Sequence, residues 1–187
     1  MQAGAGRTGK MWAVEHSGVK PDMLTFGKGI GSDLPMAGLM MRSDLAAQIP
    51  DGSMPNTFAA NSLSAVVALT NIAILQDPEL DLLNRAHVLG LEAQERIRGF
   101  NSPLVGEVRG RGLMIGIELV EDPDTKEPLS RDKIGQLMGY LMNQGVLMIP
   151  CGRYSNVMRV MPSLTISRAL FFKALDIFGD ALASLKA

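Results

Sequence analysis

The stretch that decides how this chain folds is Leu24-Thr25-Phe26-Gly27-Lys28-Gly29-Ile30-Gly31. A short apolar run at residues 23–26 leads into this glycine turn, which favours neither helix nor strand. A second apolar run follows at residues 35–41. Glycine and proline bound both runs, so we expect two short buried strands with one lysine on the turn after the first.

Lys28 places a primary amine on this turn. A lysine between glycines is usually a solvated loop residue, but here it stands between two predicted strands. Burial favours the uncharged form of an amine, which is nucleophilic. Such an amine can form a Schiff base and can move a proton as a general base. We therefore expect Lys28 to be enclosed and chemically active.

The sequence on either side predicts two structural parts. Residues 61–75 are apolar on nearly every side, which indicates a buried helix. An amphipathic pattern from Pro78 to about residue 98 predicts a second helix, and we place a domain transition near residues 76–80. Beyond it we expect an α+β part, with strands at 105–108, 113–120, 146–149 and 157–160, and helices at 131–143 and 170–185.

Composition excludes several classes of protein. The 187 residues carry 18 basic and 19 acidic side chains, and this balance gives no electrostatic reason to expect nucleic acid or an acidic membrane surface as a partner. A single cysteine, Cys151, excludes an internal disulfide and suits a reducing compartment. No apolar run reaches the length of about 20 residues that spans a bilayer, and the N-terminus lacks a signal-peptide pattern. We expect a cytoplasmic protein.

The segment Gly4 to Lys10 offers an alternative from another class, a nucleotide-binding module. It matches G-x-G-x-x-G and the start of G-x-x-x-x-G-K. Both motifs need a strand before the loop and a helix behind it. Met11 stands where a P-loop needs Ser or Thr, and Asp22 lies only 22 − 9 = 13 residues after Gly9, short of the usual place of a ribose-binding acid.

Other titratable residues give no second site. The only histidines, His16 and His87, are far apart and have no cysteine or carboxylate at ligand spacing, so we expect no metal. Cys151 has no paired histidine that would make it a nucleophile. Glu118 and Glu121, near the end of a predicted strand, are interpreted as structural.

Several segments, taken together, resemble class III (omega-amino-acid) aminotransferases, a family of pyridoxal-phosphate enzymes. The segment from Gln2 to Ala13 is similar to the one that follows an Asp-Glu-x-Gln motif, and the stretch around Lys28 is similar to the Schiff-base lysine motif. The interval from Gln2 to Lys28, 28 − 2 = 26 residues, also suits the family. Three later segments resemble further signatures in the same order: Asn56 to Asn61, Val108 to Glu118 and Asn156 to Ser167.

The resemblance implies an α/β fold of fold-type I, with residues 1–76 as the C-terminal part of the large cofactor domain and residues 77–187 as a connecting helix and the small α+β domain. It implies that Lys28 carries pyridoxal 5'-phosphate and that Gln2 bonds its phenolic oxygen. Thr57 would contact the cofactor phosphate of a neighbouring subunit, so a homodimer with shared active sites is expected. Arg159 would bind a substrate carboxylate, and Trp12 would line the substrate entrance or pack its helix.

The reaction that the resemblance implies is transfer of an amino group from an amino donor to a 2-oxo acid acceptor. The donor would be an omega-amino acid or an amine, since the segments are most like those of 4-aminobutyrate aminotransferases. Epimerases and a decarboxylase of the same family share the lysine chemistry and remain alternatives.

The sequence also departs from the family pattern. Asp33 stands where glycine is usual, Ala59-Ala60 replaces Gly-Gly, and Ser62 stands where proline is common. In the family, an aspartate binds the pyridine nitrogen of the cofactor, and a separate upstream loop binds its phosphate. Both features would fall before Gln2. We therefore expect the chain to be part of a larger enzyme and to be inactive alone.

Overall fold

The structure, a computed structural model, describes residues 2–53 and 55–185 and forms two compact units. The first unit extends to Asn84 and the second begins at Arg85. The division between a large-domain part at residues 1–76 and a second part at 77–187 remains a prediction about the domains of the family fold.

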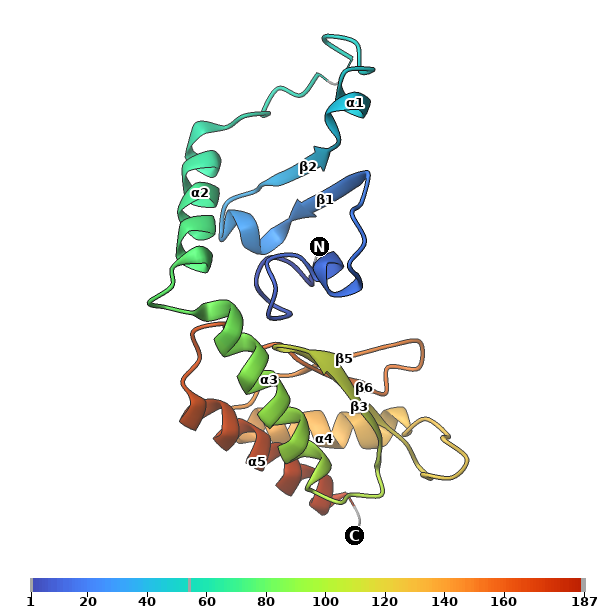
Figure 1. Cartoon of the computed structure of the whole chain (residues 1–187). Helices are drawn as coiled ribbons and strands as arrows, with labels where there is room; N and C mark the ends of the chain where they lie inside the picture. The colour runs from blue at the N-terminus through green and yellow to red at the C-terminus, as the bar shows by residue number, and fades with distance from the viewer. Residues whose placement is uncertain (1, 54, 186–187) are drawn as a thin grey trace. The chain divides into compact units, whose positions relative to one another are not determined.

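The first unit is built on a two-stranded antiparallel hairpin. Its strands are β1 (Met23–Gly27) and β2 (Ala37–Met41), which lie side by side in Figure 1. Between them lies η2 (Lys28–Gly31), a short 3-10 helix where the sequence indicated no regular structure. Flanking elements are η1 (Ala13–Ser17), α1 (Ser43–Ala46) and α2 (Ser62–Gln76).

The elements of the first unit are less buried than the sequence suggested. The hairpin strands alternate between more and less exposed residues, and Met23 is 53% exposed. On α2 only Ser64 and Ala68 are buried, while one set of large apolar side chains is exposed: Leu63, Val66, Leu69 and Ile74. The prediction of buried strands and a buried helix is therefore wrong within this unit, because a single hairpin offers too little surface to cover a helix that is apolar all round.

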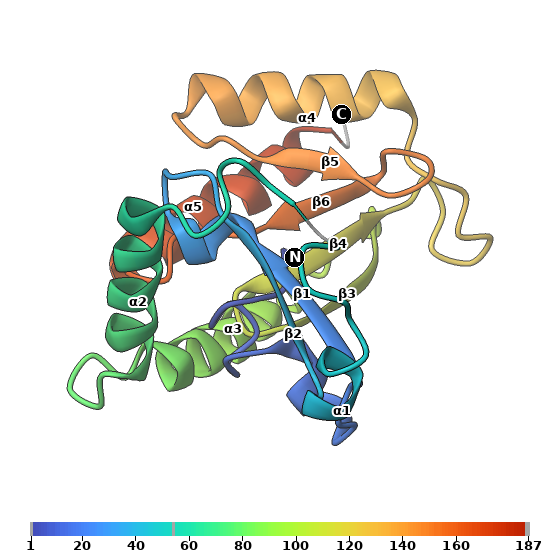
Figure 2. The same cartoon turned by 90° about the horizontal axis from the view of Figure 1, so that it is seen from above.

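The second unit is a four-stranded antiparallel sheet with helices on one face. Its strands run in the order β3-β4-β6-β5, as Figure 2 shows, and α3, α4 and α5 lie together on one side of the sheet in Figure 1. The bounds are α3 (Leu82–Arg98), β3 (Val105–Arg111), β4 (Met114–Leu119), α4 (Arg131–Asn143), β5 (Ile149–Cys151), β6 (Val157–Val160) and α5 (Arg168–Ser184). The α+β pattern predicted for this part is confirmed in every element, with β5 displaced toward the C-terminus.

α3 begins later than its amphipathic pattern predicted. Asp77 Oδ1 accepts hydrogen bonds from the backbone N–H of Glu79 at 2.8 Å and of Leu80 at 3.3 Å. An aspartate that bonds the amides ahead of it in this way favours a turn. Residues 78–80 therefore form a turn, and the helix starts at Leu82.

The core of the second unit lies between the sheet and the helices. Along β4, Ile115, Ile117 and Leu119 are at most 1% exposed, whereas the alternate residues are half-buried on the opposite face. This period of two follows from the pleat of a strand. The helices complete the core with Ala86, Ala93, Leu137, Leu141, Phe178 and Leu182. The opposite face of the sheet, which we call the open face, carries the alternate side chains.

Gly90 on α3 packs against the β3–β4 turn. A Cβ at this position would lie 2.1 Å from the backbone oxygen of Gly112, a contact that no side chain can relieve. We expect Gly90→Ala to destabilise the second unit by about 1–3 kcal/mol, although alanine is the better helix former. Chemical unfolding followed by the emission of the tyrosines measures this change.

The matched control is Gly135→Ala on α4, where an added Cβ meets nothing within 4 Å. This change should stabilise by up to about 1 kcal/mol, because only helix propensity is altered. Equal effects of the two substitutions would contradict the close approach of α3 to the turn.

Candidate active site

Lys28 is positioned by the end of a strand. It begins η2 directly after β1, and its φ of +52° lies in the left-handed region that residues other than glycine seldom adopt. Strained backbone of this kind is concentrated at functional sites. The turn is anchored by Ile30, which is 1% exposed and whose carbonyl accepts a hydrogen bond of 3.1 Å from Asn71 Nδ2 on α2.

The amine of Lys28 is accessible. Its side chain is exposed, and among residues 2–53 and 55–185 its Nζ has no hydrogen bond or ion pair. The sequence predicted an enclosed lysine, and that prediction is wrong for the described residues. The buried atoms of the turn belong to Gly27, Ile30 and Gly31, so the backbone is anchored while the side chain projects outward. An unpaired amine on a fixed backbone is available to react with an aldehyde.

A small cavity lies next to the lysine turn. It has a volume of about 80 Å³, and its lining includes Ala3, Trp12 and Gly27. Ala3 follows Gln2 and Gly27 precedes Lys28, so the chain neighbours of two of the three predicted cofactor residues meet Trp12 there. Cofactor sites in proteins have volumes of about 300–1,000 Å³. The cavity alone therefore cannot enclose a cofactor, and it forms one edge of a candidate site.

Trp12 packs within the first unit. Its ring centroid is 5.7 Å from that of Phe26 on β1, with an angle of 44° between the planes. A Cβ on Gly4 would lie 3.0 Å from the Trp12 ring. Trp12 is half-buried, so it both packs on the hairpin and lines the cavity.

The glycine loop from Gly4 to Lys10 is closed by its own backbone. The N–H of Gly6 donates to Met11 O at 3.1 Å, and buried Thr8 Oγ1 lies 3.1 Å from His16 Nε2. The segment behind the loop is η1, a 3-10 helix of five residues. Phosphate-binding loops depend on the N-terminus of an α-helix. Residues 2–18 contain no such helix, so they give the nucleotide-binding alternative no support.

Thr57 lies on an exposed turn in the first unit, at residues 57–60. The turn begins where Asn56 Oδ1 accepts a hydrogen bond of 2.9 Å from Phe58 N. Thr57 has no hydrogen-bond partner within residues 2–53 and 55–185. Ala60 has a φ of +54°, which glycine adopts more readily.

Arg159 belongs to the second unit. It lies on β6 between Met158 and Val160, which are 0% and 6% exposed on the core face. Since strand residues alternate, the half-buried Arg159 occupies the open face of the sheet. Its cross-strand partners are Gly116 on β4 and Ile149 on β5.

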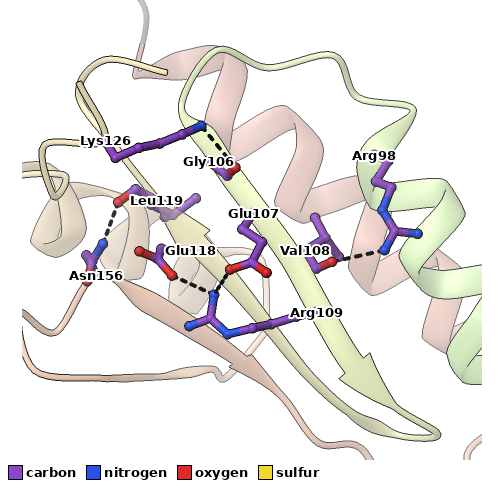
Figure 3. Close-up of polar contacts among 9 residues, drawn as sticks. All are labelled: Arg98, Gly106, Glu107, Val108, Arg109, Glu118, Leu119, Lys126 and Asn156. Atoms are coloured by element: carbon purple, nitrogen blue, oxygen red, sulfur yellow. Dashed lines mark hydrogen bonds and ion pairs between the residues drawn. The ribbon is translucent and has the colours of Figure 1, made fainter. Parts of the chain in front are cut away.

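An ion-pair cluster on the same open face was not foreseen. Arg109 Nη1 on β3 lies 2.5 Å from Glu107 Oε2 and 2.5 Å from Glu118 Oε2 on β4, as Figure 3 shows. The hydrogen bond to Glu118 raises the pKa of the Arg109 guanidinium above its ordinary value. The sequence predicts a structural role for Glu118 and indicates no role for Arg109. The sequence pattern that could have indicated this cluster is the alternation Glu-x-Arg on β3 together with a glutamate on β4.

Two further hydrogen bonds in Figure 3 hold β3 and β4, the strands that carry this cluster. Arg98 Nη2 on α3 donates to Val108 O at 2.9 Å, and Asn156 Nδ2 donates to Leu119 O at 2.7 Å. Asn156 is 3% exposed, so its amide is a buried link between β4 and the segment before β6. The two contacts therefore tie β3 and β4, the strands that carry the cluster, to neighbouring segments.

The described residues show neither a cluster of metal ligands nor a membrane-spanning helix. In residues 2–53 and 55–185, no group of three His, Cys, Asp or Glu side chains could hold a metal ion. No helix in that part of the chain has the length and apolar character needed to cross a membrane.

Comparison with known proteins gives one family. The model of the class-III aminotransferases matches residues 1–182. The chain is 33% identical to 4-aminobutyrate aminotransferase GabT of Escherichia coli K12, over 100% of this chain and 43% of that protein. It is 35% identical to a leucine/methionine racemase of Thermococcus litoralis, over 100% of this chain and 41% of that protein.

Solved structures show the same likeness. An aminotransferase of Bacillus anthracis matches with a TM-score of 0.88 and 31% identity, over 97% of this chain and 43% of that one. A transaminase from the marine bacterium Virgibacillus matches with a TM-score of 0.90 and 26% identity, over 98% of this chain and 44% of that one. The chain thus spans less than half the length of these relatives.

Proposed function

This chain belongs to the class III aminotransferases, and from that membership we propose that it is part of an enzyme that transfers an amino group from an omega-amino acid or amine to a 2-oxo acid. The predicted α/β fold of fold-type I is confirmed by the structural matches. Pyridoxal phosphate is the cofactor of this family. Relatives named 4-aminobutyrate and 5-aminovalerate aminotransferases support an omega-amino acid as the donor.

The observation that carries the proposal is Lys28, an unpaired amine on a strained turn fixed by buried neighbours. In this proposal Lys28 holds pyridoxal phosphate covalently, and its Nζ moves the proton at the amine-bearing carbon of the substrate. The cofactor, when bound, supplies an electron sink. Gln2, whose neighbour Ala3 lines the cavity beside the turn, bonds the phenolic oxygen.

Arg159 provides the substrate contact in this proposal. A guanidinium presents two parallel N–H donors that match a carboxylate, which an ammonium cannot do. The open face of the sheet leaves the arginine half-buried, so it is partly desolvated and still reachable. Trp12 contributes an apolar surface at the entrance.

The proposed enzyme is a homodimer with residues from both subunits at each site. Thr57 of the partner subunit binds the cofactor phosphate, a role that suits an exposed hydroxyl with no described hydrogen bond in its own chain. Residues 1–76 form the C-terminal part of the large domain, and residues 77–187 form a connecting helix and the small domain. The 187-residue chain alone, which is less than half the length of its relatives, is proposed to be inactive.

Trapping of the cofactor tests the central assignment. Purified enzyme mixed with pyridoxal phosphate should turn yellow, and borohydride should make the link between lysine and cofactor permanent. Mass spectrometry of the digested protein should then place the added mass on the peptide that contains Lys28. Modification of Lys10 or Lys20 in its place would contradict the proposal, and a colourless protein that responds to ATP would favour a nucleotide site.

A second candidate reaction is racemisation or epimerisation of an amino acid. The likeness to the leucine/methionine racemase, and to an alanine/serine racemase of Pyrococcus horikoshii at 33% identity, favours it. Transamination needs a 2-oxo acid acceptor, whereas inversion at one carbon does not. Loss of optical rotation of L-leucine in the absence of any 2-oxo acid would identify the racemase, and strict dependence on the acceptor would exclude it.

A further inference from the structure

The ring of Phe26 lies across the hairpin of the first unit. The register pairs Phe26 on β1 with Gly38 on β2. A Cβ at Gly38 would lie 2.2 Å from Phe26 Cζ and 2.6 Å from its Cε2. The phenyl ring therefore occupies the space that a side chain at position 38 would fill, an arrangement in which an aromatic residue covers a glycine on the neighbouring strand. Only glycine at this position lets the ring lie there.

Phe26 in turn contacts Trp12. The two ring centroids are 5.7 Å apart, and the planes are at 44° to one another. Aromatic pairs at such a separation attract each other beyond the effect of buried area alone. The backbone of Gly4 also lies close to the indole, since a Cβ there would be 3.0 Å from Trp12 Cε3. Phe26 and Gly4 thus limit the orientations that the half-buried indole can adopt.

Both aromatic residues line the cavity beside the lysine turn. The lining includes Trp12, Phe26 and Gly27, and Gly27 directly precedes Lys28. Phe26 is on β1, the strand that ends where the lysine turn begins. The strand that leads to the reactive amine therefore also carries the residue that holds the indole.

We propose that Phe26, supported by Gly38, is a positioning residue that holds the indole of Trp12 beside the lysine turn, and that Trp12 binds the apolar part of an amino donor, in particular an aryl group. This inference rests on the proposed function, in which Lys28 carries the cofactor. A ring that is already held in one orientation binds a planar apolar group at a smaller entropic cost. An aromatic pair that only stabilised the hairpin would affect all donors alike.

The test uses the larger enzyme of which this chain is proposed to be a part, loaded with pyridoxal phosphate. In F26L, which keeps an apolar side chain but loses the ring, the KM for 1-phenylethylamine should rise about fivefold, the size of one lost aromatic contact. The KM for 4-aminobutyrate, which has no aryl group, and the kcat for both donors should stay within about twofold. An equal rise in KM for both donors would overturn the proposal, since the ring would then serve only the hairpin.

G38A tests the support of the ring. The added Cβ displaces the phenyl ring of Phe26, so G38A should raise the KM for 1-phenylethylamine as F26L does. Because both changes act on the same ring, F26L/G38A should have no larger effect than F26L alone. Additive effects would contradict the role of Gly38. The matched control is L39A, at the next residue of β2, which is 43% exposed and lies on the opposite face of the strand; it should change neither KM.

A second pair of variants tests whether Phe26 acts through Trp12. W12A should raise the KM for 1-phenylethylamine at least as much as F26L does. Addition of F26L to W12A should raise this KM no further, because a positioning residue has no effect once the group that it positions is gone. A further rise in F26L/W12A would show that Phe26 acts by another route, and the proposal would be wrong.

A binding measurement without turnover complements the kinetics. Enzyme whose cofactor has been fixed by borohydride can bind 1-phenylethylamine but cannot transfer its amino group. The amine should change the emission of Trp12, the only tryptophan of this chain, and the change should be absent in W12F. The Kd from this titration should rise about fivefold in F26L, for the same loss of an aromatic contact. An emission that does not respond to the amine would contradict contact with Trp12.

The outcomes separate this proposal from the proposed function. If the cofactor is trapped on Lys28 and W12A leaves the KM for 1-phenylethylamine unchanged, the roles of Trp12 and Phe26 are wrong and that of Lys28 stands. If the cofactor is trapped elsewhere, the proposed function is wrong and the inference built on it falls too.

Discussion

In the larger enzyme of which this chain is proposed to be a part, replacing Lys28 by alanine should abolish amino-group transfer, with a loss in kcat of about 10³-fold or more. A positioned base that moves a proton contributes about 10²–10⁴-fold to a rate, and Lys28 is also the proposed covalent attachment of the cofactor. The turn itself should persist, because it is anchored by Ile30 and Asn71 and not by the lysine side chain. Transamination rates and the yellow colour measured together give the result.

Lys10→Ala is the matched control for this change. Lys10 also follows a glycine in a loop of the first unit and is exposed, but it belongs to the segment that a nucleotide site would use. We expect Lys10→Ala to retain colour and activity within about threefold, as is usual for surface changes. Loss of activity in Lys10→Ala with retention in Lys28→Ala would reverse the assignment.

The largest effect on stability should come from Leu175→Ala on α5. Leu175 is 3% exposed and belongs to the core between the helices and the sheet. Removal of its side chain loses the transfer free energy of the buried atoms and leaves a cavity, at a cost of about 2–5 kcal/mol. Leu170→Ala, the same change on the same helix at a residue that is 58% exposed, should cost within about 0.5 kcal/mol.

The two units can be followed separately in this experiment. The chain has two tyrosines, Tyr140 and Tyr154, both in the second unit, and one tryptophan, Trp12, in the first. In urea unfolding, Leu175→Ala should lower the midpoint of the tyrosine signal and leave that of Trp12 nearly unchanged. Equal destabilisation by Leu175→Ala and Leu170→Ala would mean that α5 is not packed as described.

The secondary structure of the second unit could be predicted from the sequence, because the residue patterns that indicate helices and strands are local. Along β4, apolar residues alternate with others, and helix α4 was predicted with its observed bounds, Arg131–Asn143. The start of α3 was missed because Asp77 bonds the next amides, a short-range contact that competes with helix formation. The register between strands, which brings Arg109, Gly116 and Arg159 into one row, depends on pairings that no single segment encodes.

The candidate site, too, could be predicted from the sequence only in part. Lys28 was singled out from its glycine context, and its place after a strand is confirmed. Its left-handed φ and its exposure could not be deduced, because they depend on how η2 is anchored to α2. The pairing of Arg109 with two carboxylates was missed, because charged strand residues are ordinarily solvated and only the register shows that they meet.

The exposed apolar side chains of α2 have a practical consequence for anyone who purifies this chain. Leu63, Val66, Leu69 and Ile74 form a hydrophobic stripe that is exposed in the folded first unit. Dyes such as ANS brighten on apolar protein surfaces, and their fluorescence is commonly taken as the sign of a molten globule. A bright dye signal from this chain will therefore report the stripe on native molecules, and loss of tertiary packing must be judged from near-UV circular dichroism.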